Sequence, residues 1–259
     1  MTTTYANLAW PADPFRTGQQ LFRKPGPMLT AFTLTPDPGD EAGQLSMVVA
    51  AMVYLPLHRT RTVMITSREM PVGFRAVSTS DHSELPALAR IADLDLARAV
   101  RHGSVMAGHL LAAELARLQE LAGGAVLRGV TSTARAWTDR DASVQGRAIQ
   151  IDTGLDLPAA SLDQACQIAR IGNRTSWEQI AHGTRADSEL ATAQTVGRCL
   201  TIALLAGRHL GRVCWQQDLN VTEAVTASAW DCFPQLRARQ CSKAVAESAG
   251  VSPGGTGAA

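Results

Sequence analysis

One stretch of the chain is apolar on every side of a helix and therefore limits the folds open to it. Residues 199–207 read Cys-Leu-Thr-Ile-Ala-Leu-Leu-Ala-Gly, and they lie within a longer helical pattern at about 188–210. A helix on a protein surface keeps one polar face, whereas a helix without such a face must be surrounded by protein. We therefore expect this helix to lie at the centre of the C-terminal half.

The N-terminal half begins with patterns typical of strands and then changes to a helical one. Three β-prone runs occupy 28–35, 45–57 and 62–77. Asp81 and Glu84 have the spacing of a capping box, which opens a helix. The leucine- and alanine-rich pattern that follows predicts one bent helix or two helices as far as Leu121.

Two further segments, 125–137 and 142–152, are joined by four polar residues, and this arrangement predicts a β-hairpin. The order of strands, helices, hairpin and helices favours an α+β fold over a doubly wound parallel one. We expect an antiparallel sheet, covered by helices within 84–121 and joined to a mostly helical C-terminal half. The expected regions are an extended arm (1–27), an α+β region (28–157), a helical region (158–249) and a disordered tail (250–259).

Composition excludes several classes of protein. The 24 basic and 23 acidic residues give a net charge of +1, so the whole chain lacks a strongly positive field. The N-terminus lacks the pattern of a signal peptide, and the most apolar stretch, 47–57, is about half the length of a membrane span. We therefore expect a cytoplasmic protein without membrane contact.

Cysteine spacing and known motifs predict neither a metal nor a cofactor. The five cysteines form no C-x-x-C pair, which disfavours a zinc site, and their odd number disfavours a disulfide framework. The chain contains neither the glycine loop of nucleotide-binding proteins nor the G-x-S-x-G motif of serine hydrolases.

Asp95, His102 and His109 follow one another at intervals of seven residues, which would bring them to one face of a continuous helix. The sequence His102-Gly103-Ser104 resembles hotdog-type acyl-thioester enzymes, in which a His-Gly pair opens a central helix. The resemblance implies an acyl-thioester or other small-molecule enzyme, with His102, Ser104 and His109 as candidate catalytic residues. A hotdog fold continues with several long strands, whereas here mostly helical pattern follows, so this function is the alternative.

The leading prediction is a non-enzymatic subunit of a macromolecular assembly, with protein partners or self-association. Cations in the predicted strands could also contact the phosphates of a nucleic acid, RNA included. The candidate nucleic-acid-binding residues are Arg59, Arg61, Arg135, Arg140 and Arg147.

Overall fold

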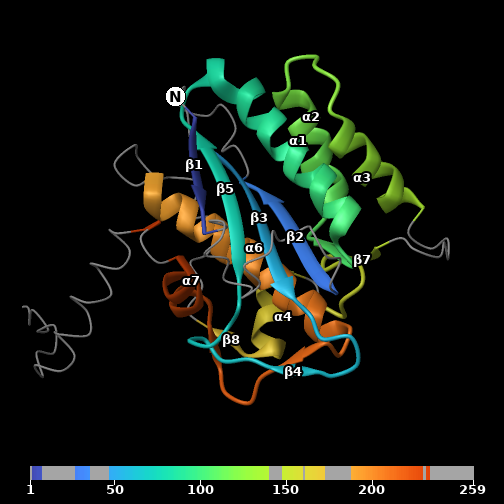
Figure 1. Ribbon diagram of the computed structural model, residues 1–259, viewed down its shortest axis with the longest axis vertical. Coiled ribbons are helices and arrows are strands. Elements are labelled where there is room, and N and C mark those ends of the chain that lie inside the picture. The colour runs from blue at the N-terminus through green and yellow to red at the C-terminus, as the bar shows by residue number, and fades with distance from the viewer. Residues whose placement is uncertain are drawn as a thin grey trace, which may run out of the picture.

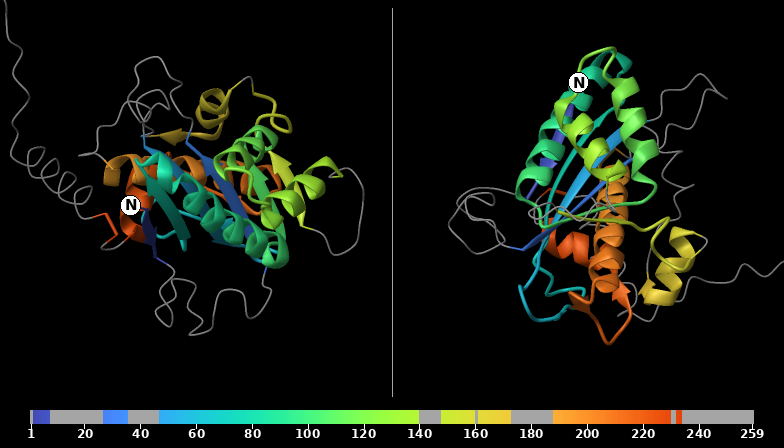
Figure 2. Two further views of the ribbon diagram at one scale, coloured as in Figure 1. Left: turned by 90° about the horizontal axis from the view of Figure 1, so that it is seen from above. Right: turned by 90° about the vertical axis from the view of Figure 1, so that its right-hand side faces the viewer.

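The computed structural model confirms the α+β fold, with one mixed sheet between two layers of helices (Figures 1 and 2). The described residues are 2–7, 27–35, 47–139, 148–159, 161–172, 188–229 and 232–233. Most of the arm, the segment 140–147 with half of the polar connection and the start of the second predicted hairpin strand, the segment 173–187, the end of the helical region at 234–249 and the tail at 250–259 lie outside them.

The central sheet has six strands in the order β1-β5-β3-β2-β6-β7. The first four in that order pair antiparallel, as the sequence predicted, while β6 and β7 run parallel to β2. The strands are β1 (Thr3–Ala6), β2 (Met28–Leu34), β3 (Val48–Pro56), β5 (Gly73–Thr79), β6 (Val105–Gly108) and β7 (Ile149–Asp152). Two small sheets pair β4 (Val63–Met64) with β9 (Val213–Cys214), and β8 (Ile171–Gly172) with β10 (Leu219–Asn220).

Helices cover both faces of the sheet. One layer, green in the right-hand view of Figure 2, is formed by the helices between residues 82 and 138. The other layer is built around α6. The first layer comprises α1 (Leu85–His102), α2 (Leu111–Leu121) and α3 (Arg128–Thr138), with the short 3-10 helix η1 (His82–Glu84) before α1. The second comprises α4 (Leu162–Ala169), α6 (Ser188–His209) and α7 (Val221–Ala229).

Helix α6 is the central helix that the apolar run predicted. Leu200, Ile202 and Ala203 are completely buried, and they belong to the same core cluster as Leu29 of β2 and Val53 of β3. The α+β region and the helical region therefore share a hydrophobic core. The helix is long and apolar enough to cross a membrane, but 78% of its most apolar window is buried inside the protein, as in a core helix.

The predicted hairpin at 125–152 is wrong in its first half, because residues 128–138 form helix α3. Leu127, Val130 and Trp137 are buried at helical spacing, and this packing overrides the β propensity of the segment. Gly129 brings α3 against α1 so closely that an added Cβ would lie 2.0 Å from the carbonyl oxygen of Asp93. The second half does form a strand, β7, but it pairs parallel to β6.

The expected helical pattern up to Leu121 is also interrupted by a strand. Helix α1 ends at His102, and β6 then enters the sheet between β2 and β7. All four residues of β6 are buried, so the strand lacks the alternation by which a half-exposed strand is recognised. His102 therefore ends a helix, whereas the hotdog resemblance required it to open one.

The beginning of the predicted arm is a strand of the sheet. β1 pairs antiparallel with β5, and the Asn7 side chain anchors the chain after it. The amide of Asn7 donates to the carbonyl oxygens of Val72 and Ser228, and its oxygen accepts from the N–H of Phe74. Only residues 2–7 and 27 of the arm belong to the described part.

Candidate functional site

Two of the candidate catalytic residues, Ser104 and His109, are not brought together by the fold. Ser104 and His109 lie at opposite ends of β6, about 16 Å apart at the usual rise of a strand. The Ser104 hydroxyl accepts from the N–H of Met28 at 2.8 Å and donates to its carbonyl oxygen at 3.0 Å. Ser104 thus holds the starts of β2 and β6 together, which is a structural task.

Asp95, the first of the three residues expected on one helix face, belongs to an ion-pair network between α1 and β5. Its side chain is 6% exposed and lies 3.4 Å from the guanidinium of Arg75 and 3.3 Å from that of Arg98. Burial raises the pKa of Asp95, while the two arginines act in the opposite direction. The carboxylate is already occupied by cations of the chain itself.

At the carboxyl end of β6, His109 lies beside the end of β7. Its Nδ1 is 3.1 Å from the hydroxyl of Thr153, and burial together with the nearby Arg198 lowers its pKa. Asp152, which is 1% exposed, accepts hydrogen bonds from the backbone N–H groups of Leu110, Leu111 and Gly154. This carboxylate therefore fixes the turn that leads into α2.

A second polar group, the Glu114 cluster of Thr33, Glu114 and Arg198, crosses from one layer of helices to the other. β6 pairs with β2 only as far as Ala31, so Glu114 of α2 can reach past the end of β6. The hydroxyl of Thr33 donates to Glu114 Oε1 at 2.8 Å, and Arg198 of α6 lies 3.6 Å from the same oxygen.

The carboxyl group of Glu114 is strongly perturbed by its surroundings. Burial raises its pKa to about 7, although Arg198 and Thr33 favour the ionised form. The side chain is 12% exposed, and Oε2 has no hydrogen-bond partner among the described residues. The cluster therefore joins the two layers through a group that titrates near neutral pH.

Three of the predicted nucleic-acid-binding arginines belong to the described residues, and they lie in different parts of the molecule. Arg59 and Arg61 are exposed in the connection between β3 and β4, at the end of the molecule away from α3 (Figure 1). Arg135 is exposed on α3, a helix rather than the expected hairpin strand. Arg140 and Arg147 lie outside the described residues. The described arginines of this group therefore do not share one surface.

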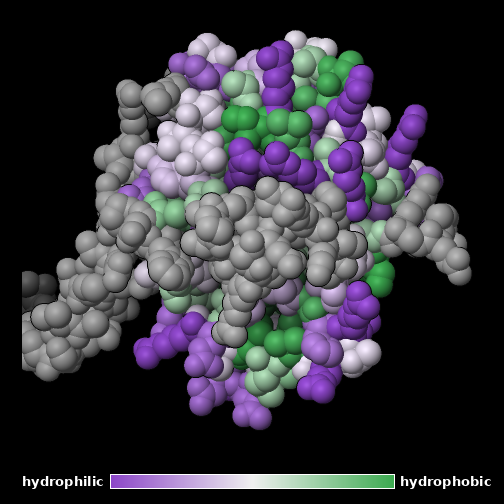
Figure 3. Space-filling model, viewed as in Figure 1, coloured by the Kyte–Doolittle hydropathy of each residue, from purple (hydrophilic) through white to green (hydrophobic). Residues whose placement is uncertain are grey.

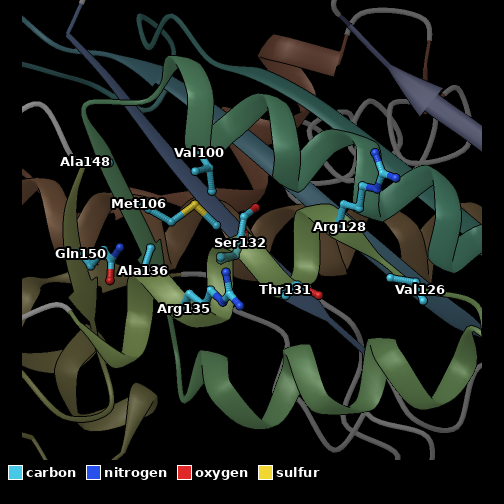
Figure 4. A pocket seen from close by; sticks show the side chains of 11 residues that line it. Val100, Met106, Val126, Arg128, Thr131, Ser132, Arg135, Ala136, Ala148 and Gln150 are labelled. Atoms are coloured by element: carbon cyan, nitrogen blue, oxygen red, sulfur yellow. The ribbon is translucent and has the colours of Figure 1, made fainter.

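Arg135 does line a pocket, here named the α3 pocket, which lies between α1, α3 and the β6–β7 side of the sheet. Its volume is about 480 Å³, within the range of small-molecule sites. In Figure 4, Ser132 lies between Arg128 and Arg135 on α3, while Met106 and Gln150 extend from the neighbouring strands. The lining residues are Val100, Met106, Val126, Arg128, Thr131, Ser132, Thr133, Arg135, Ala136, Ala148 and Gln150.

The position of the polar side chains follows from helical geometry. Arg128, Ser132 and Arg135 occupy positions i, i+4 and i+7 of α3, which return to the same face. The opposite face of α3 is held in the core by Val130 and Trp137. The amphipathic pattern of α3 thus turns two guanidinium groups and a hydroxyl toward the pocket.

The electrostatics of the α3 pocket favour an anion. None of its eleven lining residues is acidic, and neither Arg128 nor Arg135 forms an ion pair within the described part of the chain. The surface above α1 and α3 carries projecting hydrophilic side chains with apolar ones between them (upper right of Figure 3). A phosphate or carboxylate would therefore meet two cations that have no carboxylate partner there.

The remainder of the lining is apolar, with one unsatisfied polar atom. Val100, Met106 and Ala136 provide carbon and sulfur surface next to the arginines. Gln150 Oε1 is buried and has no hydrogen-bond partner among the described residues. Buried oxygens without partners are uncommon because they lose their hydration.

A second and larger hollow, of about 950 Å³, lies on the other side of α3 against α2. Most of its lining is apolar, with exposed alanines of α2 at Ala112, Ala113 and Ala116, and its acidic residues are Asp139 and Asp152. Arg135 lines this groove as well, but Arg128 does not, so the α3 pocket, which both arginines line and which has no acidic lining residue, is the better candidate for an anionic ligand.

Sequence reasoning named Arg135 but missed Arg128, Ser132, Met106 and Gln150 as its neighbours. A helical reading of 128–138 would have found the two arginines and the serine, whereas no sequence signal connects Gln150 with them. The described residues also contain no group of three metal-ligating side chains. Comparison with models of protein families, with curated proteins and with solved structures finds no match for this chain.

Proposed function

We propose that this chain is a non-enzymatic binding protein that holds a small organic phosphate in the α3 pocket. The observation that carries the proposal is the pair of guanidinium groups, Arg128 and Arg135, which face a pocket of about 480 Å³ without an acidic lining residue. Arginine is suited to phosphate because its planar donors match two phosphate oxygens at once.

The pocket favours a small ligand over an extended nucleic acid. A nucleic-acid interface places many cations along one surface, while Arg59 and Arg61 lie at the other end of the molecule from α3 (Figure 1). The apolar part of the lining also suits a ligand whose body is less polar than its phosphate. Membership of a larger assembly stays a prediction, and a ligand-holding subunit agrees with it.

Isothermal titration calorimetry with 1-naphthyl phosphate tests the proposal, because this probe combines one phosphate with an apolar ring system. We expect binding by the native protein, and no binding of 1-naphthol at the same concentration. Replacement of both arginines (Arg128→Gln with Arg135→Gln) should weaken binding about tenfold or more, since hydrogen bonds to charged groups contribute about 1.5–3 kcal/mol.

Arg61→Gln is the matched control, because Arg61 is also an exposed arginine and lies at the other end of the molecule from α3. We expect this variant to bind 1-naphthyl phosphate like the native protein. Equal weakening by the control and by the double variant would show non-specific charge attraction, and the proposed function would then be wrong. The absence of any binding at millimolar probe would also contradict it.

A further inference from the structure

The outer sides of α1 and α3 carry exposed arginines from both helices. On α1, Arg90, Leu94 and Arg101 are exposed at positions i, i+4 and i+11, which return to nearly the same side of a helix. On α3, Arg128 and Arg135 are exposed at positions i and i+7. These four arginines, together with Leu94, are here named the α1–α3 face.

The two helices point these side chains in the same direction. Gly129 packs α3 directly against α1, and the N–H of Val130 donates to the Asp93 carboxylate at 2.8 Å. The opposite sides of both helices, with Leu96 of α1 and Trp137 of α3, are buried in one core cluster against the sheet. The outer sides therefore face away from the sheet together, and hydrophilic side chains project from this region at the upper right of Figure 3.

Carboxylates of the two helices do not neutralise this face. Helix α3 contains no acidic residue, and the exposed Asp139 lies beyond its end. Helix α1 contains Asp93, which is half-buried, and Asp95, which is buried between Arg75 and Arg98. None of the four arginines of the face forms an ion pair within the described part of the chain. Since the net charge of the whole chain is only +1, the positive field here is local.

We propose that the α1–α3 face docks on a membrane surface that contains anionic phospholipids. Its arginines contact headgroup phosphates, while Leu94 enters the region between the headgroups. This contact goes beyond the proposed function, because Arg90, Leu94 and Arg101 do not line the α3 pocket. The expectation of no membrane contact rested on the lack of a spanning stretch, and contact through surface side chains requires none.

Exposed aliphatic side chains favour a lipid surface over a nucleic acid. Leu94 is 58% exposed, and Val126, which lies just before α3, is 83% exposed. At a lipid surface, the burial of such side chains adds to the electrostatic attraction. Single-stranded nucleic acids are held by stacking on aromatic side chains as well as by cations. Trp137 is the only phenylalanine, tyrosine or tryptophan of α1 and α3, and it is buried.

Co-sedimentation with vesicles tests the inference. We expect binding to vesicles of phosphatidylglycerol and phosphatidylcholine in equal amounts, and no binding to vesicles of phosphatidylcholine alone. Each arginine near an anionic surface contributes about fivefold in affinity, so Arg90→Gln with Arg101→Gln should weaken binding about tenfold or more. The matched control, Arg59→Gln with Arg61→Gln, removes the same charge at the other end of the molecule and should change binding less than about twofold. Leu94→Gln keeps the charge but removes apolar surface, and it should weaken binding at least about threefold.

Several outcomes would overturn the inference. They are a lack of binding to the anionic vesicles, equal weakening by the two double variants, and unchanged binding by Leu94→Gln. If a single-stranded oligouridylate binds through Arg90 and Arg101 while the vesicles do not, the face is a nucleic-acid interface and the inference is wrong. Urea unfolding should show native stability for all variants, because the replaced side chains are exposed.

The vesicle assay and the proposed function fail separately. Arg90→Gln with Arg101→Gln should bind 1-naphthyl phosphate like the native protein, since neither residue lines the α3 pocket. If the native protein does not bind 1-naphthyl phosphate but binds anionic vesicles through Arg90 and Arg101, the proposed function is wrong and this inference stands. The reverse result leaves the proposed function in place and removes the membrane contact.

Discussion

The perturbed carboxyl group of Glu114 gives the protein a stability that decreases as pH rises. Its pKa is about 7 in the folded protein and 4.5 in its ordinary state. Between these pH values the folded protein holds a proton that the unfolded chain has released. Rising pH therefore favours the unfolded chain through this group, and the loss is complete above about pH 7.

The size of the effect follows from the same two pKa values. Each pKa unit corresponds to about 1.4 kcal/mol, so the interval from 4.5 to about 7 amounts to about 3 kcal/mol. Little of this is screened by solvent, because the side chain of Glu114 is only 12% exposed. Glu114→Gln replaces the carboxyl group with a neutral one of the same shape and removes this pH dependence.

Urea unfolding at pH 5 and at pH 8 measures the prediction. The free energy of unfolding of Glu114→Gln, relative to the native protein, should rise by about 2–3 kcal/mol between the two pH values. Glu120→Gln changes an exposed glutamate on the same helix and should show no such rise. A Glu114→Gln difference that is the same at both pH values would refute the reasoning.

Three further substitutions or reactions test the packing. Gly129→Ala places a Cβ 2.0 Å from the backbone oxygen of Asp93 and should lower the free energy of unfolding by about 3 kcal/mol or more in urea, whereas Gly172→Ala, with its nearest atom at 3.9 Å, should cost far less. Asp152→Ala leaves three backbone N–H groups without their acceptor and should cost at least about 2 kcal/mol in the same assay. The thiol of Cys199 is completely buried and its pKa is raised, so mass spectrometry after Ellman's reagent should find it unmodified until the protein unfolds.

An element was predictable from sequence where its residue pattern is compatible with only one kind of secondary structure. The run at 199–207 has no polar face, so it could only be a buried helix. Helix α7 was also predictable, because Asn220 precedes it and its side chain accepts from the N–H of Glu223 as a cap. Both signals are local and agree with the packing that surrounds them.

Prediction failed where packing decided between two local preferences. Residues 128–138 contain β-branched side chains typical of a strand, yet Leu127, Val130 and Trp137 bury one helical face against α1 and the sheet. β6 is too short and too completely buried to show a strand pattern between two helices.

The candidate site was predictable only in part, for the same reason. Arg135 stood out by its charge, but Arg59 and Arg61, which the sequence analysis grouped with it, lie at the other end of the molecule. Gln150 joins the pocket lining only because β7 places it opposite Met106, and this pairing depends on long-range contacts. Glu114 likewise meets Arg198 only because β6 ends early.

The most direct measurement is a nuclear magnetic resonance titration of methyl-labelled methionine with 1-naphthyl phosphate, because each of the seven methionines gives its own signal. Met106 is 2% exposed and lines the α3 pocket, whereas Met64 is 53% exposed on β4, close in sequence to Arg59 and Arg61. We expect the Met106 signal to shift and the Met64 signal to stay in place. A shift of Met64 without Met106, or no shift at saturating probe, would contradict a phosphate site at α3.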